Sequence, residues 1–258
     1  MASRLPNLKL ATSVGAGADG ILSASDLPMH VRVTRAVDPA LGFSMAQFVV
    51  LQLLRNFREL RTLEKQCSEK EWRRLDVRDA SRVTVGIMGL GSIGTVVASA
   101  IVGLGFKVVG WSRTGRDRPD MSVFAGERGL NDFLAASNFL VCLLPATNQT
   151  IGLLDRSRLE KLPKGAFLIN AARGGILVEN DFLDLLNENR LSGAVLDVFD
   201  TEPLPRTSPF WDCDNVLVTP HIAAQPTINV VVDQFINNLG RLENGLPILH
   251  EINRKIGY

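Results

Sequence analysis

The stretch VTVGIMGLGSIG, residues 83–94, is the most informative part of this chain and decides its fold. An apolar run at residues 83–88 leads directly into a G-x-G-x-x-G turn, and a helical pattern follows at residues 95–104. Three spaced glycines alone occur often by chance. The order of strand, glycine turn and helix is far more specific, and it predicts the dinucleotide-binding turn of a Rossmann domain.

Each glycine of this turn has a separate physical task. Gly89 permits the tight turn, Gly91 lets a pyrophosphate approach the backbone, and Gly94 lets the helix pack closely on the strand. The first helical residues, including Ser92 and Ile93, offer unpaired N–H groups and the partial positive charge of a helix N-terminus. We therefore expect all of these residues to bind the phosphates of a dinucleotide.

The end of the second predicted strand, residues 107–111, indicates which dinucleotide binds. Ser112, Arg113 and Thr114 follow it, at the place where a protein that uses NAD usually carries an acid to accept hydrogen bonds from the ribose hydroxyls. No acid occurs in residues 108–115. Arg113 could pair with a ribose 2′-phosphate, so the sequence predicts NADPH/NADP+ as cofactor, with NADH binding more weakly. The alternative interpretation of Arg113 is a solvated loop arginine.

Composition limits the class of protein. The chain has 258 residues, of which 46% are hydrophobic and 21% charged, as in an ordinary globular protein of one large or two small domains. A net charge of +1 gives no electrostatic case for binding nucleic acid or an anionic membrane, and no apolar run is long enough to span a membrane.

The three cysteines, Cys67, Cys142 and Cys213, show no metal-ligand spacing, so we expect no metal and a reducing, cytoplasmic location. Cys142 lies in an apolar run and is interpreted as a small buried hydrophobe.

Apolar runs and amphipathic patterns alternate along the rest of the chain. Strands are predicted at residues 8–13, 139–144, 166–170, 193–199 and 216–219, and helices at residues 155–162, 179–190 and 227–243. One long amphipathic helix is predicted at residues 44–65, where Phe48, Leu51, Leu54 and Leu60 recur at helical spacing. Continuous apolar strands between helices indicate a parallel sheet covered on both faces, so the fold class is α/β.

Polar and charged side chains follow the last strands of this predicted sheet. They are Asn170 with Arg173, then Asp197, Glu202 and His221. The carboxyl ends of parallel strands lie at one edge of a sheet, and ligands of open α/β folds bind there. We therefore expect these residues to lie at the same edge as the glycine turn.

His221 is the candidate general acid. It is one of three histidines and follows a strand and a proline; by itself it would be interpreted as a loop histidine. Beside a nucleotide site, imidazole is the group best suited to give a proton to the alkoxide that develops when a ketone is reduced. Glu202 could hold the ring and favour its charged form, or it could be an exposed loop acid.

Arg173 and Asp197 are the other charged candidates. Arg173 sits in a glycine-flanked turn, so its guanidinium could clamp a carboxylate and polarise the adjacent carbonyl, or it could form a surface ion pair. Asp197 ends a strand, where a buried acid without partners would be costly. We expect its carboxylate to accept a hydrogen bond from the nicotinamide carboxamide.

Together these pieces resemble the D-isomer-specific 2-hydroxyacid dehydrogenase family. The matching motifs span most of residues 40–245: GLGSIG at 89–94, VCLLP at 141–145, NAARG at 170–174, LDVF at 196–199 with EPL at 202–204, and TPH at 219–221. Within the family, WSRT at 111–114 and SPFW at 208–211 most resemble the glyoxylate/hydroxypyruvate reductase A branch.

The resemblance implies a role for each candidate residue. Arg173 corresponds to the clamp for the substrate carboxylate, Glu202 to the partner of the histidine, and His221 to the general acid. The loop at Ala16 and Gly17 would supply backbone N–H groups to the substrate carboxylate, although it could simply be a turn. Further cofactor contacts are implied at Leu144, Pro145 and Ala171.

The resemblance also implies the domain organisation. Residues 41–225 are expected to form the Rossmann domain, with residues 44–65 as the dimerising arm of a homodimer. Residues 1–40, completed by about residues 226–258, are expected to form a smaller, flavodoxin-like substrate lobe. Family members normally carry further strand–helix units before the strand at residues 8–13, so this lobe is expected to be shortened.

The expected reaction is NADPH-dependent reduction of a short 2-oxo acid, glyoxylate or hydroxypyruvate, to the D-2-hydroxy acid, glycolate or D-glycerate. The shortened lobe leaves two alternatives open: a dinucleotide-binding or interaction protein with little or no catalytic activity, and an unstable fragment that binds nothing. The complete set of arginine, glutamate and histidine favours the enzyme. Cofactor binding without turnover of any 2-oxo acid would select the first alternative.

Overall fold

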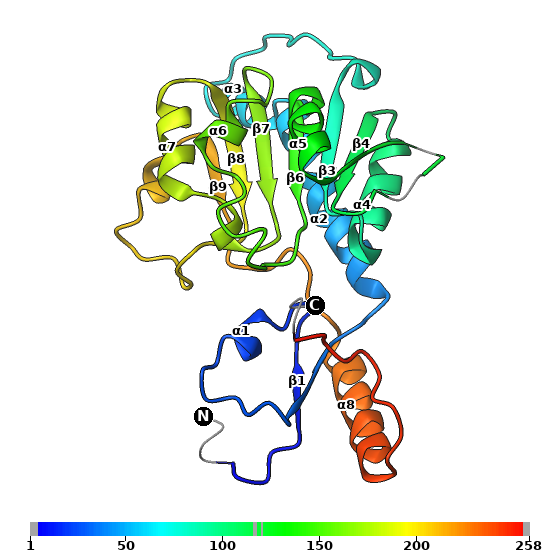
Figure 1. The fold of residues 1–258 in the computed structure, drawn as a ribbon. Coiled ribbons are helices and arrows are strands. Elements are labelled where there is room, and N and C mark those ends of the chain that lie inside the picture. Colours follow the sequence, from blue (N-terminus) through cyan, green and yellow to red (C-terminus); the bar gives the residue numbers. More distant parts are fainter. Residues whose placement is uncertain (1–4, 116–117, 120, 255–258) are drawn as a thin grey trace. The chain divides into compact units, whose positions relative to one another are not determined.

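The computed structural model describes residues 5–115, 118–119 and 121–254, which form two compact units (Figure 1). Within those residues, the first unit contains 5–41, 145–150 and 224–254, and the second contains 42–144 and 151–223. The predicted substrate lobe also includes residues 1–4 and 255–258, which lie outside the described residues. The two units are considered separately below.

The second unit is built on a seven-stranded parallel sheet with the strand order β5-β4-β3-β6-β7-β8-β9. Its strands are β3 (Thr84–Met88), β4 (Lys107–Ser112), β5 (Ser122–Ala125), β6 (Phe139–Cys142), β7 (Ala166–Asn170), β8 (Leu191–Leu196) and β9 (Val216–Val218). From β3 the chain builds outward first in one direction and then, from β6, in the other. This confirms the predicted doubly wound Rossmann sheet.

The central strands form because their residues are apolar on both faces. Every residue of β6, with the sequence FLVC, and of β7, with the sequence AFLIN, is buried. Such runs need a helical layer on each side, which is the condition for a parallel sheet. β5 was not among the predicted strands, because its four residues, SVFA, carry too short an apolar pattern to indicate a strand.

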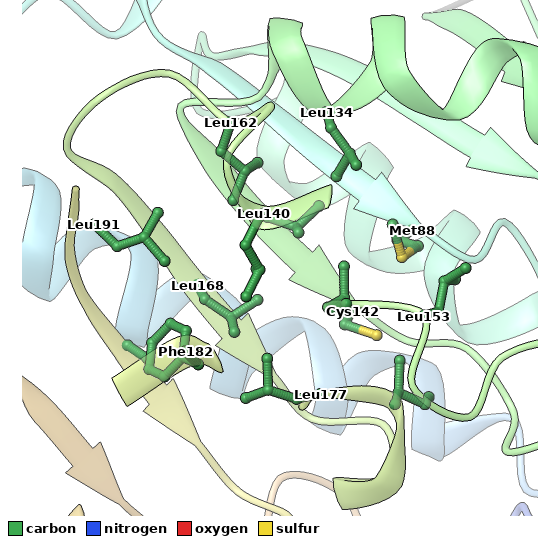
Figure 2. Close-up of a cluster of buried hydrophobic side chains, with 14 of the residues drawn as sticks. Met88, Leu134, Leu140, Cys142, Leu153, Leu162, Leu168, Leu177, Phe182 and Leu191 are labelled. Atoms are coloured by element: carbon green, nitrogen blue, oxygen red, sulfur yellow. The ribbon is translucent and has the colours of Figure 1, made fainter. Parts of the chain in front are cut away.

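One face of the sheet is covered by three helices: α5 (Gly126–Ala136), α6 (Arg156–Leu159) and α7 (Glu179–Asn187). Figure 2 shows the resulting cluster, in which Leu134 and Phe182 from the helices pack with Leu140 and Leu168 from the strands. Fully burying each of these side chains stabilises the fold by about 1.5–3 kcal/mol. Cys142 belongs to the same cluster, which confirms the prediction that it is a small buried hydrophobe. Burial raises the pKa of its thiol to about 12.

The other helices are α2 (Ala40–Phe57), which belongs to this unit from Gly42 onward, α3 (Leu60–Ser68) and α4 (Ser92–Val102). The single helix predicted at residues 44–65 is therefore wrong. Glu59 has a φ of 53°, a left-handed conformation that a right-handed helix cannot continue through. Phe57, the last residue of α2, packs edge-on against Phe106, with ring centroids 4.9 Å apart. Apolar spacing continues across this break, so periodicity alone does not reveal it.

The apolar residues at helical spacing do not all lie on the buried face of α2. Val49, Leu53 and Phe57 are buried, whereas Leu51 is 59% exposed. Gly42 lies against Val96 of α4, so α2 and α4 pack on each other. The apolar residues that suggested an amphipathic helix therefore include a second, exposed stripe in addition to the core-facing one.

The first unit contains β1 (Leu10–Ser13), α1 (Asp19–Leu22), β2 (Arg32–Arg35) and α8 (Ile228–Glu243). β1 and β2 form a two-stranded parallel sheet. Ala18, Val33 and Ile252 make its small core. β2 was not predicted, because its sequence RVTR places a charge at each end of only four residues.

Three short 3-10 helices complete the described chain: η2 (Ala80–Arg82), η3 (Gly174–Ile176) and η4 (Pro209–Asp212). Within the described residues, no helix has both the length and the apolar composition that crossing a membrane requires.

Candidate active site

The predicted site residues of the second unit follow the carboxyl ends of neighbouring parallel strands. In sheet order, Arg113 follows β4, Gly89 follows β3, Leu144 follows β6, Arg173 follows β7 and Asp197 follows β8. His221 follows β9 at the end of this row. The structure thus brings residues that are up to 132 positions apart to one edge of the sheet, as the strand-end argument predicts.

The glycine turn between β3 and α4 has the shape of a phosphate cradle. Gly89 has a φ of 110°, and its N–H donates to the carbonyl of Trp111 at 2.9 Å. A Cβ on Gly94 would lie 1.9 Å from the carbonyl oxygen of Gly89, so only glycine fits where the helix crosses the turn. α4 begins at Ser92, and its N-cap residue is Gly91. Since glycine has no side chain, the N-cap residue makes no side-chain hydrogen bond to the first turn.

Gly91 faces open space, because a Cβ built on it would meet no atom within 4 Å. The turn therefore combines uncapped N–H groups, a helix N-terminus and room for a bulky anion. These are the properties that a dinucleotide pyrophosphate requires, so the residues present fit the predicted cofactor.

The end of β4 presents the residues predicted to select the cofactor. Ser112 is the last residue of the strand, and its Oγ accepts a hydrogen bond from the N–H of Gly115 at 3.1 Å. Arg113 and Thr114 are exposed beyond it. Trp111 is buried and donates from Nε1 to the carbonyl of Gly126 at 2.9 Å, which fixes the strand end that carries Arg113.

Asn170 holds the turn that carries Arg173. Its side chain is fully buried at the end of β7; Oδ1 accepts from the N–H of Ala172 at 3.2 Å, and Nδ2 donates to the carbonyl of Arg173 at 3.4 Å. The N–H of Ala171 donates to the carbonyl of Cys142 at 3.3 Å. The guanidinium of Arg173 is half-buried and donates to the carbonyl of Ala172 at 2.6 Å. The turn is therefore closed by the amide side chain of Asn170.

Gly174 joins this turn to the loop that carries Glu202. A Cβ on Gly174 would lie 1.9 Å from the carbonyl carbon of Phe199 and 2.3 Å from the nitrogen of Asp200. The two backbones therefore touch at a place where no side chain fits. The N–H of Asp200 also donates to Oε1 of Glu179 at 3.0 Å, which anchors the same loop to the start of α7.

Glu202 and His221 form the pair that was predicted. Nδ1 of His221 lies 2.8 Å from Oε2 of Glu202, and Oε1 of Glu202 accepts from the N–H of Phe199 at 3.0 Å. Both side chains are partly exposed, at 46% for His221 and 37% for Glu202. Because a carboxylate accepts, the proton of this hydrogen bond belongs to Nδ1, which leaves Nε2 as the nitrogen available for proton transfer.

Asp197 is 1% exposed, and its carboxylate accepts hydrogen bonds from the segment that carries His221. Its burial is thus compensated by partners within the chain, which satisfies the requirement stated from the sequence. The expected contact with the nicotinamide carboxamide stays a prediction.

Ala16 and Gly17 lie in the first unit, in the loop after β1. Oγ of Ser13 donates to the carbonyl of Gly17 at 2.5 Å and accepts from the N–H of Gly15 at 3.2 Å, so the strand end fixes the loop. Pro145 also belongs to the first unit, where its carbonyl accepts from Thr150 Oγ1 at 2.7 Å.

Three residues of the site had no role assigned from the sequence. They are Asn170, which closes the Arg173 turn, Gly174, which permits the contact with Phe199, and Thr219, whose hydroxyl bonds to Asp197. The sequence did contain a signal for each of them: a polar residue at a strand end, a glycine beside the candidate arginine, and a hydroxyl two positions before the histidine.

Among the described residues, no three His, Cys, Asp or Glu side chains gather to hold a metal ion.

Comparison with known proteins places these features in one family. The family model described as "D-isomer specific 2-hydroxyacid dehydrogenase, NAD binding domain" matches residues 49–223. Glyoxylate/hydroxypyruvate reductase A of Klebsiella pneumoniae (strain 342) is 36% identical over 256 residues, covering 97% of this chain and 82% of that protein. The protein of the same name from Yersinia enterocolitica is 38% identical over 250 residues, covering 95% of this chain and 80% of that protein.

Two solved structures are similar over the whole chain. A D-isomer specific 2-hydroxyacid dehydrogenase from Xanthobacter autotrophicus Py2, in complex with NADPH and MES, has a TM-score of 0.92 and 41% identity, covering 100% of this chain and 81% of that one. An NADPH-dependent glyoxylate/hydroxypyruvate reductase from Sinorhizobium meliloti, in complex with NADP and sulfate, has a TM-score of 0.93 and 40% identity, covering 100% of this chain and 82% of that one. The chain belongs to the D-isomer specific 2-hydroxyacid dehydrogenase family.

Proposed function

We propose that this chain is an oxidoreductase that uses NADPH to reduce a short 2-oxo acid, glyoxylate or hydroxypyruvate, to the corresponding D-2-hydroxy acid. The observation that carries the proposal is the His221–Glu202 pair, with Nδ1 and Oε2 2.8 Å apart, at the same edge of the sheet as the glycine turn. Relatives named glyoxylate/hydroxypyruvate reductase A, which match 95–97% of the chain, support the substrate class.

Each charged residue of the site has a separate role in the reduction. A bound NADPH supplies the hydride. Arg173 pairs with the substrate carboxylate and polarises the adjacent carbonyl, while Nε2 of His221 gives the proton that the carbonyl oxygen needs as its carbon is reduced. Glu202 holds the imidazole through Nδ1, which orients Nε2 and stabilises the ring while it carries the proton.

The remaining contacts are assigned as follows. Gly89, Gly91, Ser92, Ile93 and Gly94 hold the pyrophosphate, and Ser112, Arg113 and Thr114 hold the ribose phosphate of the cofactor. Leu144, Pro145, Ala171 and Asp197 contact the nicotinamide half. Ala16 and Gly17 of the first unit give backbone N–H groups to the substrate carboxylate, and that unit serves as the substrate lobe.

Arg113 gives a direct test of cofactor choice. We expect Arg113→Asp to weaken NADPH binding about ten- to hundred-fold, since a hydrogen bond to a charged group is worth about 1.5–3 kcal/mol. NADH, which lacks the 2′-phosphate, should lose far less affinity. Titrations of both cofactors by quenching of protein fluorescence measure the two dissociation constants.

Arg82→Asp is the matched control, because Arg82 is an exposed arginine just before β3, at the opposite end of the sheet. It should leave both dissociation constants unchanged. Equal losses for NADPH and NADH in Arg113→Asp would mean that Arg113 does not read the phosphate.

The exposed stripe of α2 and α3 supports a homodimer. Phe43 and Leu51 of α2 are 65% and 59% exposed, and Leu60 and Leu63 of α3 are also exposed. Large apolar side chains exposed on neighbouring helices are compatible with an interface between subunits. Sedimentation velocity should show a dimer, and a single monomeric species at micromolar concentration would contradict it.

The free cysteines Cys67, Cys142 and Cys213 fit a cytoplasmic location.

The alternative of a binding protein without catalysis has its own readout. NADPH should raise the melting temperature, because a ligand that binds only the folded state stabilises it. Glyoxylate should then be consumed with NADPH. A raised melting temperature without consumption of any 2-oxo acid would select the binding protein, and no cooperative melt at all would indicate an unstable fragment.

A further inference from the structure

The segment that carries His221 is wrapped around a single buried carboxylate. The hydroxyl of Thr219 donates to Oδ1 of Asp197 at 2.5 Å, and the N–H of Ile222 donates to the same oxygen at 2.9 Å. The N–H of Ala223 donates to Oδ2 at 2.9 Å. The N–H of His221 itself donates to the backbone carbonyl of Asp197, also at 2.9 Å. Donors on both sides of the histidine therefore converge on one residue.

The backbone of His221 is in an uncommon conformation that such bonds help to hold. Its φ is 55°, in the left-handed region that few residues other than glycine occupy. Residues in sparsely populated backbone conformations persist where the surrounding structure holds them. Thr219 fixes the segment before His221, and Ile222 fixes it after, both through Oδ1 of Asp197.

The hydroxyl of Thr219 is not needed for the sheet. The backbone N–H of Thr219 already donates to the carbonyl of Leu196 at 3.0 Å, which extends the pairing of β8 and β9 by one residue. Its Oγ1 makes the additional bond to Asp197. Removing the hydroxyl therefore leaves the sheet pairing in place and withdraws one of the two donors to Oδ1.

We propose that Thr219 is a positioning residue for the reduction: its hydroxyl, acting through the buried carboxylate of Asp197, holds the imidazole of His221 at Glu202. The inference rests on the proposed function of His221 as proton donor. Without the hydroxyl, Oδ1 keeps only the donor on the far side of His221, and only backbone hydrogen bonds hold the near side of the turn. Small errors in the placement of a reacting group are costly, and a shift of about 1 Å can reduce turnover about a hundred-fold.

The test compares Thr219→Val, which keeps the shape and removes the hydroxyl, with Thr219→Ser, which keeps the hydroxyl. Asp197 is left intact, because it is also assigned to the nicotinamide. We expect Thr219→Val to lower kcat at least about tenfold, while the KM for glyoxylate and the Kd for NADPH change less than about threefold. Thr219→Ser should restore kcat to near the wild-type value. Thr84→Val, the same change at the start of β3, is the matched control.

A spectroscopic readout makes the result independent of turnover. The Nδ1 nitrogen of His221, hydrogen-bonded to Glu202, should give a ¹⁵N resonance, detected through the ring C–H protons, that is absent in His221→Asn. Thr219→Val should weaken or shift this resonance, and Thr219→Ser should keep it.

Several outcomes would overturn the inference. They are a wild-type kcat and an unchanged resonance in Thr219→Val, equal impairment by valine and serine, or a loss of NADPH affinity as large as the loss of kcat. If the wild type reduces no 2-oxo acid, the proposed function fails, and the resonance still reports whether Thr219 positions His221.

Discussion

His221→Asn is expected to lower kcat for glyoxylate by about 10²- to 10⁴-fold, the contribution typical of general acid catalysis. Asparagine is the sharpest replacement, because it tolerates the left-handed backbone of residue 221, where φ is 55°, better than most residues do. It can also keep a donor toward Glu202 while it removes the transferable proton. Steady-state consumption of NADPH measures kcat, and a fluorescence titration should give an NADPH dissociation constant near that of the wild type.

The chain offers a matched control for this variant. His250 has a φ of 56° and is not among the residues assigned to the site, so His250→Asn makes the same chemical change on the same backbone conformation. It should leave kcat unchanged. If His221→Asn turned over glyoxylate within a few-fold of the wild type, His221 would not be the proton donor.

Gly94→Ala is expected to destabilise the fold, and Gly91→Ala to weaken cofactor binding without destabilising it. A Cβ on Gly94 would lie 1.9 Å from the carbonyl oxygen of Gly89, and such a clash costs about 1–3 kcal/mol or more. Alanine favours a helix over glycine by about 1 kcal/mol, so a net loss identifies the clash. At Gly91 a Cβ meets nothing within 4 Å and instead fills the space assigned to the pyrophosphate.

Urea unfolding without cofactor measures the free energy of unfolding, and the rise in melting temperature with NADPH measures binding. Gly91→Ala should unfold near the wild-type urea concentration and show a reduced rise with NADPH. Gly240→Ala in α8, where a Cβ also meets nothing within 4 Å, controls for the substitution itself and should be neutral or slightly stabilising. A Gly94→Ala protein with wild-type unfolding, or a Gly91→Ala protein with wild-type NADPH binding, would contradict these assignments.

The central sheet was predictable because its strands carry their pattern within a few residues. β6 and β7 are buried throughout, so their apolar runs indicate strands without any knowledge of their neighbours. β2 and β5, with four residues each, form because adjacent strands pair with them, and their own sequences indicate little. The break between α2 and α3 depends on the left-handed backbone at Glu59, and nothing in the apolar spacing marks it.

The candidate site was also predictable only in part. The positions of Arg173, Asp197 and His221 could be predicted, because the rule that ligands bind at the carboxyl ends of strands depends only on the fold. The bond from Thr219 to Asp197 spans 22 positions and depends on how a loop folds back on a strand end. The contact of Gly174 with Phe199 likewise depends on the paths of two loops, which local sequence does not determine.

The central claim is that this chain reduces 2-oxo acids with NADPH, and the most direct test is the stoichiometry and chirality of a single reaction. The purified wild-type chain is given NADPH and hydroxypyruvate, and both the oxidised cofactor and the product are quantified, with the product's configuration read by chiral chromatography. The account predicts one D-glycerate for each NADPH consumed, and a much slower reaction with NADH. NADPH that binds and raises the melting temperature, with no 2-oxo acid reduced or with L-glycerate as the product, would contradict it.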